Sequence, residues 1–227
     1  MRSESTAGQQ ALVLYDYWRS SASYRVRIAL NLKGLSYEQR PVNLVVDGGQ
    51  QNSQGYRKLN PQGLVPALVH GEQVITQSMA ICEYLEETFP GYPLLPDQPG
   101  QKSIARSMAL SIACDIHPLN NLRVQQYLKG RLGVSGDQAV TWMNHWVSVG
   151  FTSLEEQLQA SDACGKCCVG EKPGLVDCFL VPQVYNAERF NCDLSGFPLI
   201  QEIAAYCRSL PAFQAAAPET QPDSAPG

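Results

Sequence analysis

Short apolar runs of strand length alternate with helically spaced apolar positions through residues 11–89 of the chain. The opening strand, helix and strand require a parallel pair, whereas Gly71-Glu72 fits a tight hairpin between two later strands. The order βαβαββα therefore predicts a mixed sheet. The predicted strands lie at 12–15, 37–44, 67–70 and 74–76, and the predicted helices lie at 25–33, near Tyr56 and at 79–88.

The pattern changes at a proline-rich connector. Prolines recur at every third position from Pro90 to Pro99, a spacing that neither a helix nor a central strand tolerates. Beyond the connector strand signals nearly vanish, and apolar residues follow helical spacing, as in Met143, Val147 and Leu154. An α/β domain followed by an all-α helical bundle is the predicted fold class. Its predicted divisions are a flexible tail at 1–10, an α/β domain at 11–89, a linker at 90–100 and a helical domain at 101–227.

Composition narrows the class of protein. The net charge is -4 and no Lys or Arg cluster stands out, so we expect no nucleic-acid partner. Residues 1–10 lack the apolar segment of a signal peptide, and no apolar run is long enough to span a bilayer, so we expect no membrane partner.

Eight cysteines without a secretory signal indicate reduced thiols in a cytoplasmic protein. Cys164 and Cys167 form a Cys-x-x-Cys pair, but no second pair or nearby histidine completes a zinc set, so we expect no metal site.

A hydroxyl-rich turn follows the first predicted strand, where residues 19–25 read Arg-Ser-Ser-Ala-Ser-Tyr-Arg. The helix that follows begins with unpaired N–H groups and partial positive charge, which favour an anion. A thioredoxin-like layout places a Cys-x-x-Cys pair at this turn, whereas this chain has Ser20-Ser21-Ala22-Ser23. Sulfur chemistry here therefore needs a thiol from a ligand. A serine hydroxyl can favour the thiolate of that ligand by donating a hydrogen bond.

Two further segments of the first domain fit a small peptide ligand. Val65-Pro66 precedes the third strand. A cis bond there would turn the N–H and C=O of Val65 outward for pairing with an extended peptide, and a trans loop proline is the alternative. Gln77-Ser78 opens the next helix, where the Ser78 hydroxyl can cap the helix, bind a ligand carboxylate or do both.

Together these segments resemble the zeta class of glutathione transferases and its bacterial relatives, the maleylacetoacetate isomerases. The resemblance implies a thioredoxin-like domain joined to an all-helical domain, which is the glutathione transferase fold. It also implies a homodimer, with glutathione as an obligatory cosubstrate that isomerisation does not consume. The segments that carry the resemblance, which covers nearly the whole chain, are 19–30, 47–51, 60–66, 77–78, 114–121, 180–183 and 186–190.

The resemblance also implies roles for individual residues. Ser20 is expected to contact the glutathione sulfur, with Ser21 beside it. Arg19 and Arg189 are candidates for the substrate carboxylates, because a guanidinium matches a carboxylate with two parallel hydrogen bonds. The alternatives are a solvated rim charge for Arg19 and a partner of a helix-face carboxylate for Arg189. The residues implied for glutathione binding are Ser20, Ser21, Ala22, Ser23, Tyr24, Arg25, Gln51, Val65, Gln77, Ser78, His117, Asn121, Leu122 and Arg123.

Some positions depart from the family pattern or leave two interpretations open. Many eukaryotic members carry Cys and Trp at the positions of Ala22 and Tyr24, which places the expected chemistry on Ser20. Gly174 stands where a Ser or Thr usually forms a capping box with the Asp three residues later, and glycine is a tolerable N-cap. His117 precedes a proline, which predicts a helix kink; its side chain either faces the cleft or is a polar group at that kink.

The activity that the resemblance implies is the cis–trans isomerisation of maleylacetoacetate, a cis enone with two carboxylates, to fumarylacetoacetate in tyrosine and phenylalanine catabolism. Thiolate addition to the alkene leaves a single bond that rotates, and elimination then returns the thiol. Maleylpyruvate isomerase, which uses the same chemistry on a shorter acid, is the nearest alternative, and a transferase acting on α-haloacids is also compatible. A non-catalytic glutathione-binding module is the alternative from a different class. The intact Ser20-Ser21 pair and Arg189 argue against that module.

Overall fold

The computed structural model describes residues 10–224. The predicted tail at 1–10 lies outside these residues, apart from Gln10. No helix within 10–224 is long and apolar enough to cross a membrane.

A four-stranded mixed sheet forms the first part of the molecule. β1 (Leu12–Asp16) pairs in parallel with β2 (Tyr37–Pro41) and antiparallel with β3 (Ala67–His70). β4 (Gln73–Thr76) pairs antiparallel with β3, which gives the strand order β2-β1-β3-β4. Gly71 has a φ of 61° in the turn between β3 and β4, a conformation that glycine adopts without steric cost. The predicted mixed sheet and hairpin are confirmed.

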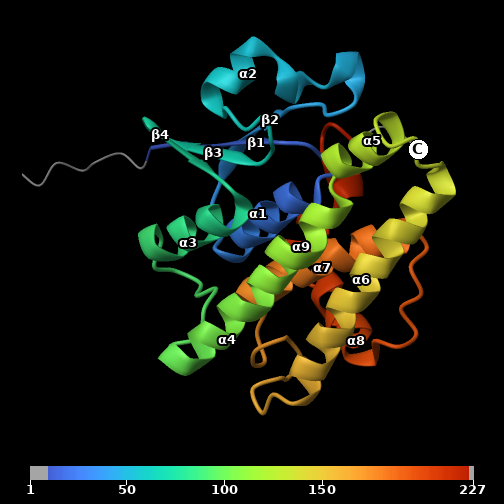
Figure 1. Ribbon diagram of the computed structural model, residues 1–227. Coiled ribbons are helices and arrows are strands. Elements are labelled where there is room, and N and C mark those ends of the chain that lie inside the picture. The colour runs from blue at the N-terminus through green and yellow to red at the C-terminus, as the bar shows by residue number, and fades with distance from the viewer. Residues whose placement is uncertain (1–9, 225–227) are drawn as a thin grey trace, which may run out of the picture.

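Helices cover both faces of this sheet. α1 (Ser21–Leu32) and α3 (Ser78–Thr88) lie on one side, and α2 (Gln54–Leu59) lies on the other (Figure 1). β2 ends at Pro41, before the predicted end, because the chain turns at Asn43. The Asn43 side chain accepts the N–H groups of the second and third residues after it, which is a typical Asx turn.

The start of α1 differs from the prediction. The helix begins at Ser21, whereas the apolar pattern placed its start at Arg25. Ser20 is the N-cap, and its Oγ accepts a hydrogen bond of 3.2 Å from the N–H of Ser23. This first turn carries few apolar side chains, so its helical state follows from the cap rather than from periodicity.

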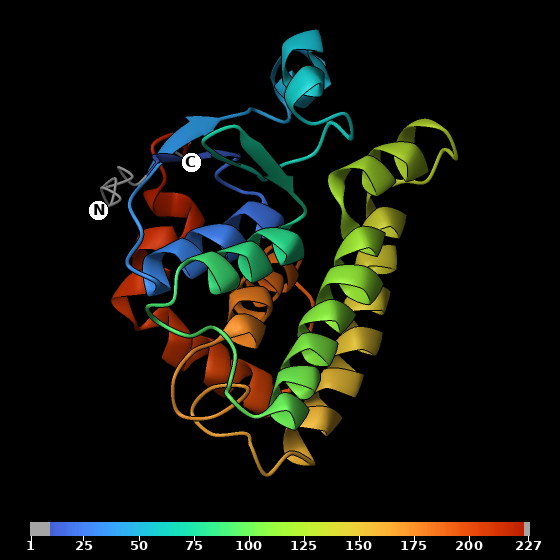
Figure 2. The same ribbon diagram turned by 90° about the vertical axis from the view of Figure 1, so that its left-hand side faces the viewer.

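Beyond the connector the described residues form helices and loops. α4 and α6 run side by side, and α7 lies between them and the sheet domain (Figures 1 and 2). The helices are α4 (Pro99–Leu110), α5 (Leu122–Gly130), α6 (Gly136–Gln159), α7 (Leu175–Arg189), α8 (Pro198–Arg208) and α9 (Pro211–Ala216).

The predicted kink near His117 is present. α4 continues into a π-helical turn at Ser111–Ile116 and then into a 3₁₀ turn at His117–Asn120 that contains Pro118. Such turns redirect a helix by breaking its regular hydrogen-bond ladder. The redirected chain brings the start of α5 beside the serine turn that precedes α1.

One hydrophobic core joins the sheet domain to the helical domain. α1 packs against α7 and α9, and buried side chains continue from Leu14 and Ile28 to Phe179 and Phe213. A smaller cluster near α2 consists of Val42, Tyr56 and Val65. The hydrophobic core therefore crosses the connector. We retain the divisions 11–89, 90–100 and 101–227 as a proposal, because they mark where the type of secondary structure changes and not where the packing ends.

Candidate active site

A cavity of about 350 Å³ lies where the sheet domain meets the helical domain. Its walls come from the turn before α1, from loops at 44–52 and 62–65, from residues 117–126 and from the end of α7. Its lining residues, all within the described part of the chain, include four arginines and no carboxylate. The cavity therefore favours an anionic ligand. The four arginines are Arg19, Arg57, Arg123 and Arg189.

The start of α1 presents hydrogen-bond donors to this cavity. Ser20, Ser21 and Ala22 all line it. The Oγ of Ser20 accepts the Ser23 N–H, and the carbonyl of Ser20 accepts the Tyr24 N–H at 2.9 Å. The hydroxyl hydrogen of Ser20 stays free to donate, because an alcohol can accept and donate at once. Among residues 10–224, the N–H groups of Ser21 and Ala22 have no hydrogen-bond partner, as expected in the first turn of a helix.

A buried ion pair holds the serine turn in place. Arg27 Nη1 lies 2.7 Å from Asp16 Oδ2, and both side chains are fully buried. Arg27 also donates to the carbonyl of Trp18 at 2.9 Å and to that of Ala216 at 3.0 Å. Burial raises the pKa of Asp16, and the positive charge of Arg27 opposes that rise. The Arg27 charge is therefore matched within the protein, and its geometry fixes the backbone that leads to Ser20.

Arg19 and Arg189, by contrast, lack an acidic partner in the described part of the chain. Neither forms an ion pair among residues 10–224. The neighbouring Glu188 pairs instead with Arg208, at 2.8 Å. Burial lowers the pKa of Arg189, and the positive charge of Arg19 lowers it further, so the two cations act on each other. Two cations on one cavity, without a countercharge among the described residues, have the chemistry to bind carboxylates.

His117 lines the cavity as a neutral side chain. Burial lowers the pKa of His117 to about 3, and the charges of Arg25 and Arg123 add to this effect. Its Nε2 lies 3.4 Å from Asn121 Nδ2, and its Nδ1 is buried without a partner among the described residues. Of its two interpretations, the placement favours a side chain that faces the cleft.

The loop before β3 offers free backbone groups. The Val65-Pro66 bond is cis, and Val65 lines the cavity. Within residues 10–224, neither the N–H nor the C=O of Val65 has a hydrogen-bond partner. The hydroxyl of Tyr56 and the Nδ2 of Asn60 both donate to the Leu64 carbonyl at 2.7 Å, which fixes this loop.

Five of the residues expected to bind glutathione do not line the cavity: Ser23, Tyr24, Arg25, Gln77 and Ser78. Tyr24 packs edge-on against the ring of Tyr185. Arg25 Nη1 donates to Ser78 Oγ at 3.1 Å, and burial lowers the pKa of Arg25 to about 10. Arg25 therefore remains a cation at neutral pH behind the cavity wall. The remaining expected residues, Ser20, Ser21, Ala22, Gln51, Val65, His117, Asn121, Leu122 and Arg123, line the cavity together.

A hydrogen bond to a lining residue connects Gln77 to the cavity. Its Nε2 donates to Gln62 Oε1 at 2.8 Å, and Gln62 lines the cavity. Gln77 has a φ of 71°, which is rare for a residue with a side chain and is typical of ligand sites. It also holds the N-cap position of α3, so Ser78 is the first residue of the helix and not its cap.

Comparison with known proteins identifies the family. The family model described as the glutathione S-transferase N-terminal domain matches residues 14–93. A probable maleylacetoacetate isomerase of Vibrio cholerae serotype O1 is 52% identical over 94% of this chain and 99% of its own. The chain belongs to the zeta-class glutathione transferase and maleylacetoacetate isomerase family.

Solved structures of this zeta-class family have the same fold. The holo structure of a maleylpyruvate isomerase, a bacterial zeta-class member, has a TM-score of 0.91, with 45% identity over 94% of this chain and all of that one. A maleylacetoacetate isomerase from Methylobacterium extorquens AM1, crystallised with bound malonate and GSH, has a TM-score of 0.90 with 37% identity, over 94% of this chain and 100% of that one. The predicted thioredoxin-like and all-helical architecture is therefore confirmed.

Sequence reasoning missed several polar residues that line the cavity of this zeta-class protein. Asn120 is buried, and neither atom of its amide has a partner among the described residues. Asn186 Oδ1 is also buried and has no partner within residues 10–224. The spacing of Asn186 and Arg189, three residues apart on α7, places them on one helix face and could have revealed Asn186. The other missed lining residues with polar side chains are Tyr17, Asn52, Arg57, Gln62, Gln125 and Gln126.

Proposed function

We propose that the protein is a glutathione-dependent isomerase that converts maleylacetoacetate to fumarylacetoacetate in tyrosine and phenylalanine catabolism. The observation that carries this proposal is the cavity with four arginines and no carboxylate among its described lining residues. Glutathione and maleylacetoacetate each have two carboxylates, which arginines bind with charge-assisted hydrogen bonds. The relative that binds both GSH and malonate, a dicarboxylate, supports the same pairing of ligands.

The chemistry of the cavity fits glutathione. Buried polar atoms without partners in the described structure line it, and such atoms usually have a partner in proteins. A peptide with amide, amino and carboxylate groups would satisfy them, while the backbone of Val65 would pair with its extended chain. These buried atoms are Arg19 Nε, Gln51 Oε1, His117 Nδ1, both amide atoms of Asn120, and Asn186 Oδ1.

Residues behind the wall support those that touch the ligand. We assign Gln77 and Ser78 to the γ-glutamyl end of the peptide, where the start of α3 supplies N–H groups. Arg25 orients Ser78 through its hydrogen bond of 3.1 Å and adds positive charge. Ser23 and Tyr24 have buried side chains, so their contribution is to hold the first turn of α1 in position.

Glutathione, when bound, supplies a thiolate that adds to the cis alkene and leaves again after the bond has rotated. Ser20 favours the thiolate over the thiol by donating its free hydroxyl hydrogen, and Ser21 and the N–H groups at the start of α1 add to this effect. Arg19 and Arg189 hold the substrate carboxylates and stabilise negative charge that develops on the substrate oxygen. His117 is neutral at physiological pH and serves as a hydrogen-bonding group of the cavity wall.

Maleylpyruvate isomerisation is the second candidate, supported by the TM-score of 0.91 to a maleylpyruvate isomerase. Both substrates are cis alkenes with two carboxylates, so they differ mainly in length. The deciding experiment measures kcat/KM for both acids side by side, with and without glutathione. We expect conversion only with glutathione and a higher kcat/KM for maleylacetoacetate. The opposite order would establish the second candidate, and no conversion of either acid would reject isomerase activity.

We further propose that the protein is a cytoplasmic homodimer. The family membership supports this proposal. Sedimentation equilibrium should give twice the chain mass of 24.9 kDa. A mass that stays at one chain across the accessible protein concentrations would contradict it.

A further inference from the structure

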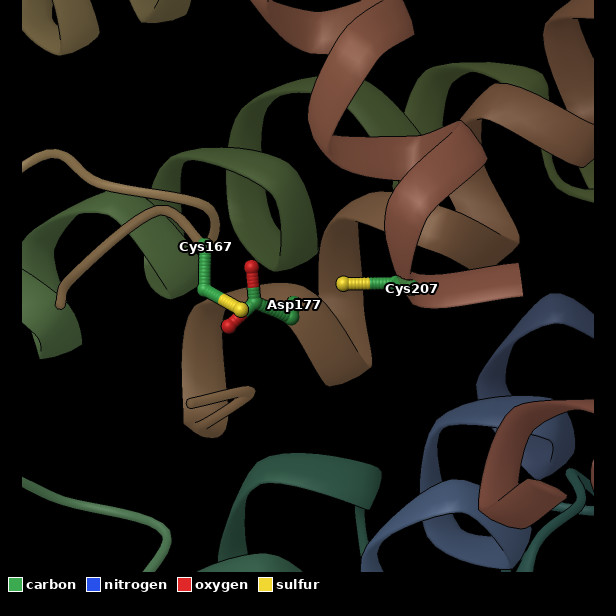
Figure 3. Close-up of side chains that lie close together, drawn as sticks. All are labelled: Cys167, Asp177 and Cys207. Atoms are coloured by element: carbon green, nitrogen blue, oxygen red, sulfur yellow. The ribbon is translucent and has the colours of Figure 1, made fainter. Parts of the chain in front are cut away.

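Two thiols and a carboxylate meet in the core of the helical domain. Cys167 lies in the loop before α7, Asp177 lies on α7 and Cys207 lies on α8 (Figure 3). Their Sγ and carboxylate oxygen atoms all lie within 4.8 Å of one another, and all three residues are buried. Cys164, the other half of the Cys-x-x-Cys pair seen in the sequence, is not part of this cluster.

Hydrogen bonds fix the backbone around the cluster. In the loop that carries Cys167, hydrogen bonds of 3.1 Å run from the N–H of Gly165 to the C=O of Cys167 and from the N–H of Cys167 to the C=O of Gly170. Asp177 Oδ1 accepts the N–H of Cys168 at 2.9 Å, and Oδ2 accepts the N–H of Gly174 at 2.7 Å. An ionised carboxylate accepts about four hydrogen bonds, so each oxygen retains a lone pair for another partner.

The cluster has acidic groups but no matching cation from the described part of the chain. Asp177 forms no ion pair with a Lys, Arg or His among residues 10–224. Packing of protonated thiols as small apolar groups explains the burial of Cys167 and Cys207. Asp177 also caps α7 by accepting the Gly174 N–H, which accounts for one of its oxygen atoms but brings no full positive charge to the carboxylate.

We propose that Cys167, Asp177 and Cys207 bind a zinc ion. Two thiolates and a carboxylate are typical zinc ligands, and a dication offsets two of their three negative charges. In a tetrahedral site with Zn–S bonds of about 2.3 Å, two sulfur atoms lie about 3.8 Å apart. The donor atoms lie within 4.8 Å of one another, so side-chain shifts on the order of 1 Å would bring them to bonding distance from the ion. The Cys168 thiol, which interacts with Asp177, is a candidate donor for the fourth position.

A cavity reaches one of these ligands, Asp177. A second cavity, of about 340 Å³, lies between the proline-rich connector and the loop before α7. Asp177, Gly174 and Val169 contribute to its wall. A metal ion entering there reaches the carboxylate first, and binding then releases the two thiol protons to solvent.

The zinc site lies apart from the active site. Asp177 is in the first turn of α7 and Arg189 is its last residue, which separates them by about 18 Å at a rise of about 1.5 Å per residue. A bound ion would link α7, α8 and the loop before α7. We therefore expect zinc to stabilise the fold and to leave the chemistry at Ser20 unchanged.

Cobalt serves as the spectroscopic probe of this site. The full-length protein is reduced, freed of metal with a chelator and titrated anaerobically with Co²⁺ in the absence of glutathione. We expect a sulfur-to-cobalt charge-transfer band that saturates at one ion per chain and disappears on addition of Zn²⁺. Cys167→Ala and Cys207→Ala should each remove most of the band. Cys114→Ser, which removes an exposed thiol, and Cys178→Ala, which removes a buried thiol next to Asp177, should keep it.

Thermal unfolding and thiol labelling supply independent measurements. Zn²⁺ should raise the Tm of the wild-type protein and leave that of Cys207→Ala unchanged, because a ligand stabilises only a state that binds it. If an alanine variant does not fold, zinc should still slow alkylation of Cys167 and Cys207 in the wild-type protein, measured by mass spectrometry. A charge-transfer band that persists in both folded cysteine variants would overturn the proposal. So would a wild-type protein with no band and no protected cysteine.

Discussion

The Oγ of Ser20 accepts the N–H of Ser23 at 3.2 Å, so one hydroxyl both caps α1 and keeps its hydrogen available to the cavity. The cap fixes the orientation of the oxygen without using the group that the chemistry needs. The two functions make separate predictions, because the cap contributes to stability and the free hydrogen contributes to the acidity of a bound thiol.

Ser20→Ala should lower kcat/KM roughly 10- to 100-fold while glutathione still binds. The variant loses one hydrogen bond to a charged sulfur, which is worth about 1.5–3 kcal/mol. The pKa of the bound thiol should rise, as measured by the ultraviolet absorbance of the thiolate across pH.

Ser135→Ala is the matched control for the cap. Ser135 caps α6 with the same geometry, its Oγ accepting the Gln138 N–H at 3.2 Å, and it does not line the active-site cavity. Both variants should lose about 1 kcal/mol of stability from the lost cap. Only Ser20→Ala should change the thiol pKa, and an unchanged thiol pKa in that variant would remove Ser20 from its proposed role.

Arg189→Lys should raise the KM for the maleyl substrate about tenfold or more and leave the affinity for glutathione nearly unchanged. The lysine keeps the charge but cannot make the two parallel hydrogen bonds that a guanidinium makes with a carboxylate. Steady-state kinetics with each cosubstrate varied in turn separates the two effects.

Arg208→Lys is the control for this substitution, since Arg208 pairs with Glu188 and lies outside the cavity lining. It should leave both constants unchanged. Equal effects of Arg189→Lys on the two cosubstrates, or no effect on either, would show that Arg189 does not hold the substrate carboxylate.

The sequence predicted the features that depend on neighbouring residues. The serine turn, the hairpin at Gly71 and the kink beside Pro118 are local, and all three are present. The predicted start of α1 at Arg25 was wrong, because the cap at Ser20 and not the apolar periodicity sets where the helix begins. Apolar spacing marks the buried face of a helix but says little about its first turn.

Groupings that depend on packing between distant segments could not be predicted in the same way. Asn120 and Asn186 reach one cavity only because α7 packs against α1 and the chain turns after α4. Asp177 meets Cys207 because α8 packs against α7. No spacing within the chain encodes these contacts. The sequence therefore indicated the type of chemistry at the active site, but it did not indicate all the residues that line the cavity.

The low pKa of His117 predicts an acid-dependent loss of stability. Its folded-state pKa of about 3 lies below the ordinary value of 6.5. Below pH 6.5 the unfolded chain takes up a proton that the folded protein does not, so folding stability falls as the pH drops toward 3. One such group contributes a slope of at most about 1.4 kcal/mol per pH unit.

His117→Gln should therefore weaken this dependence, whereas His145→Gln, at an exposed position, should not. Urea unfolding at about pH 7 and about pH 4.5 gives the two free energies of unfolding for each protein. The raised pKa values of Asp16 and Asp177 act in the opposite direction, but both variants and the wild type share them, so the difference isolates His117. Equal acid dependence in wild type and His117→Gln would show that His117 titrates normally in the folded protein.

The last prediction separates an isomerase from a conjugating transferase. An isomerase site that stabilises negative charge on the substrate oxygen during thiolate attack stabilises the same charge when the thiolate leaves. Glutathione should therefore be required but not consumed, and an amount far below that of the substrate should support complete conversion. The cis-to-trans change is followed by ultraviolet absorbance, and free thiol is quantified at the end. Conversion that stops when product equals the added glutathione, with the thiol gone, would make this protein a conjugating transferase, because the site would then hold the thioether instead of expelling the sulfur.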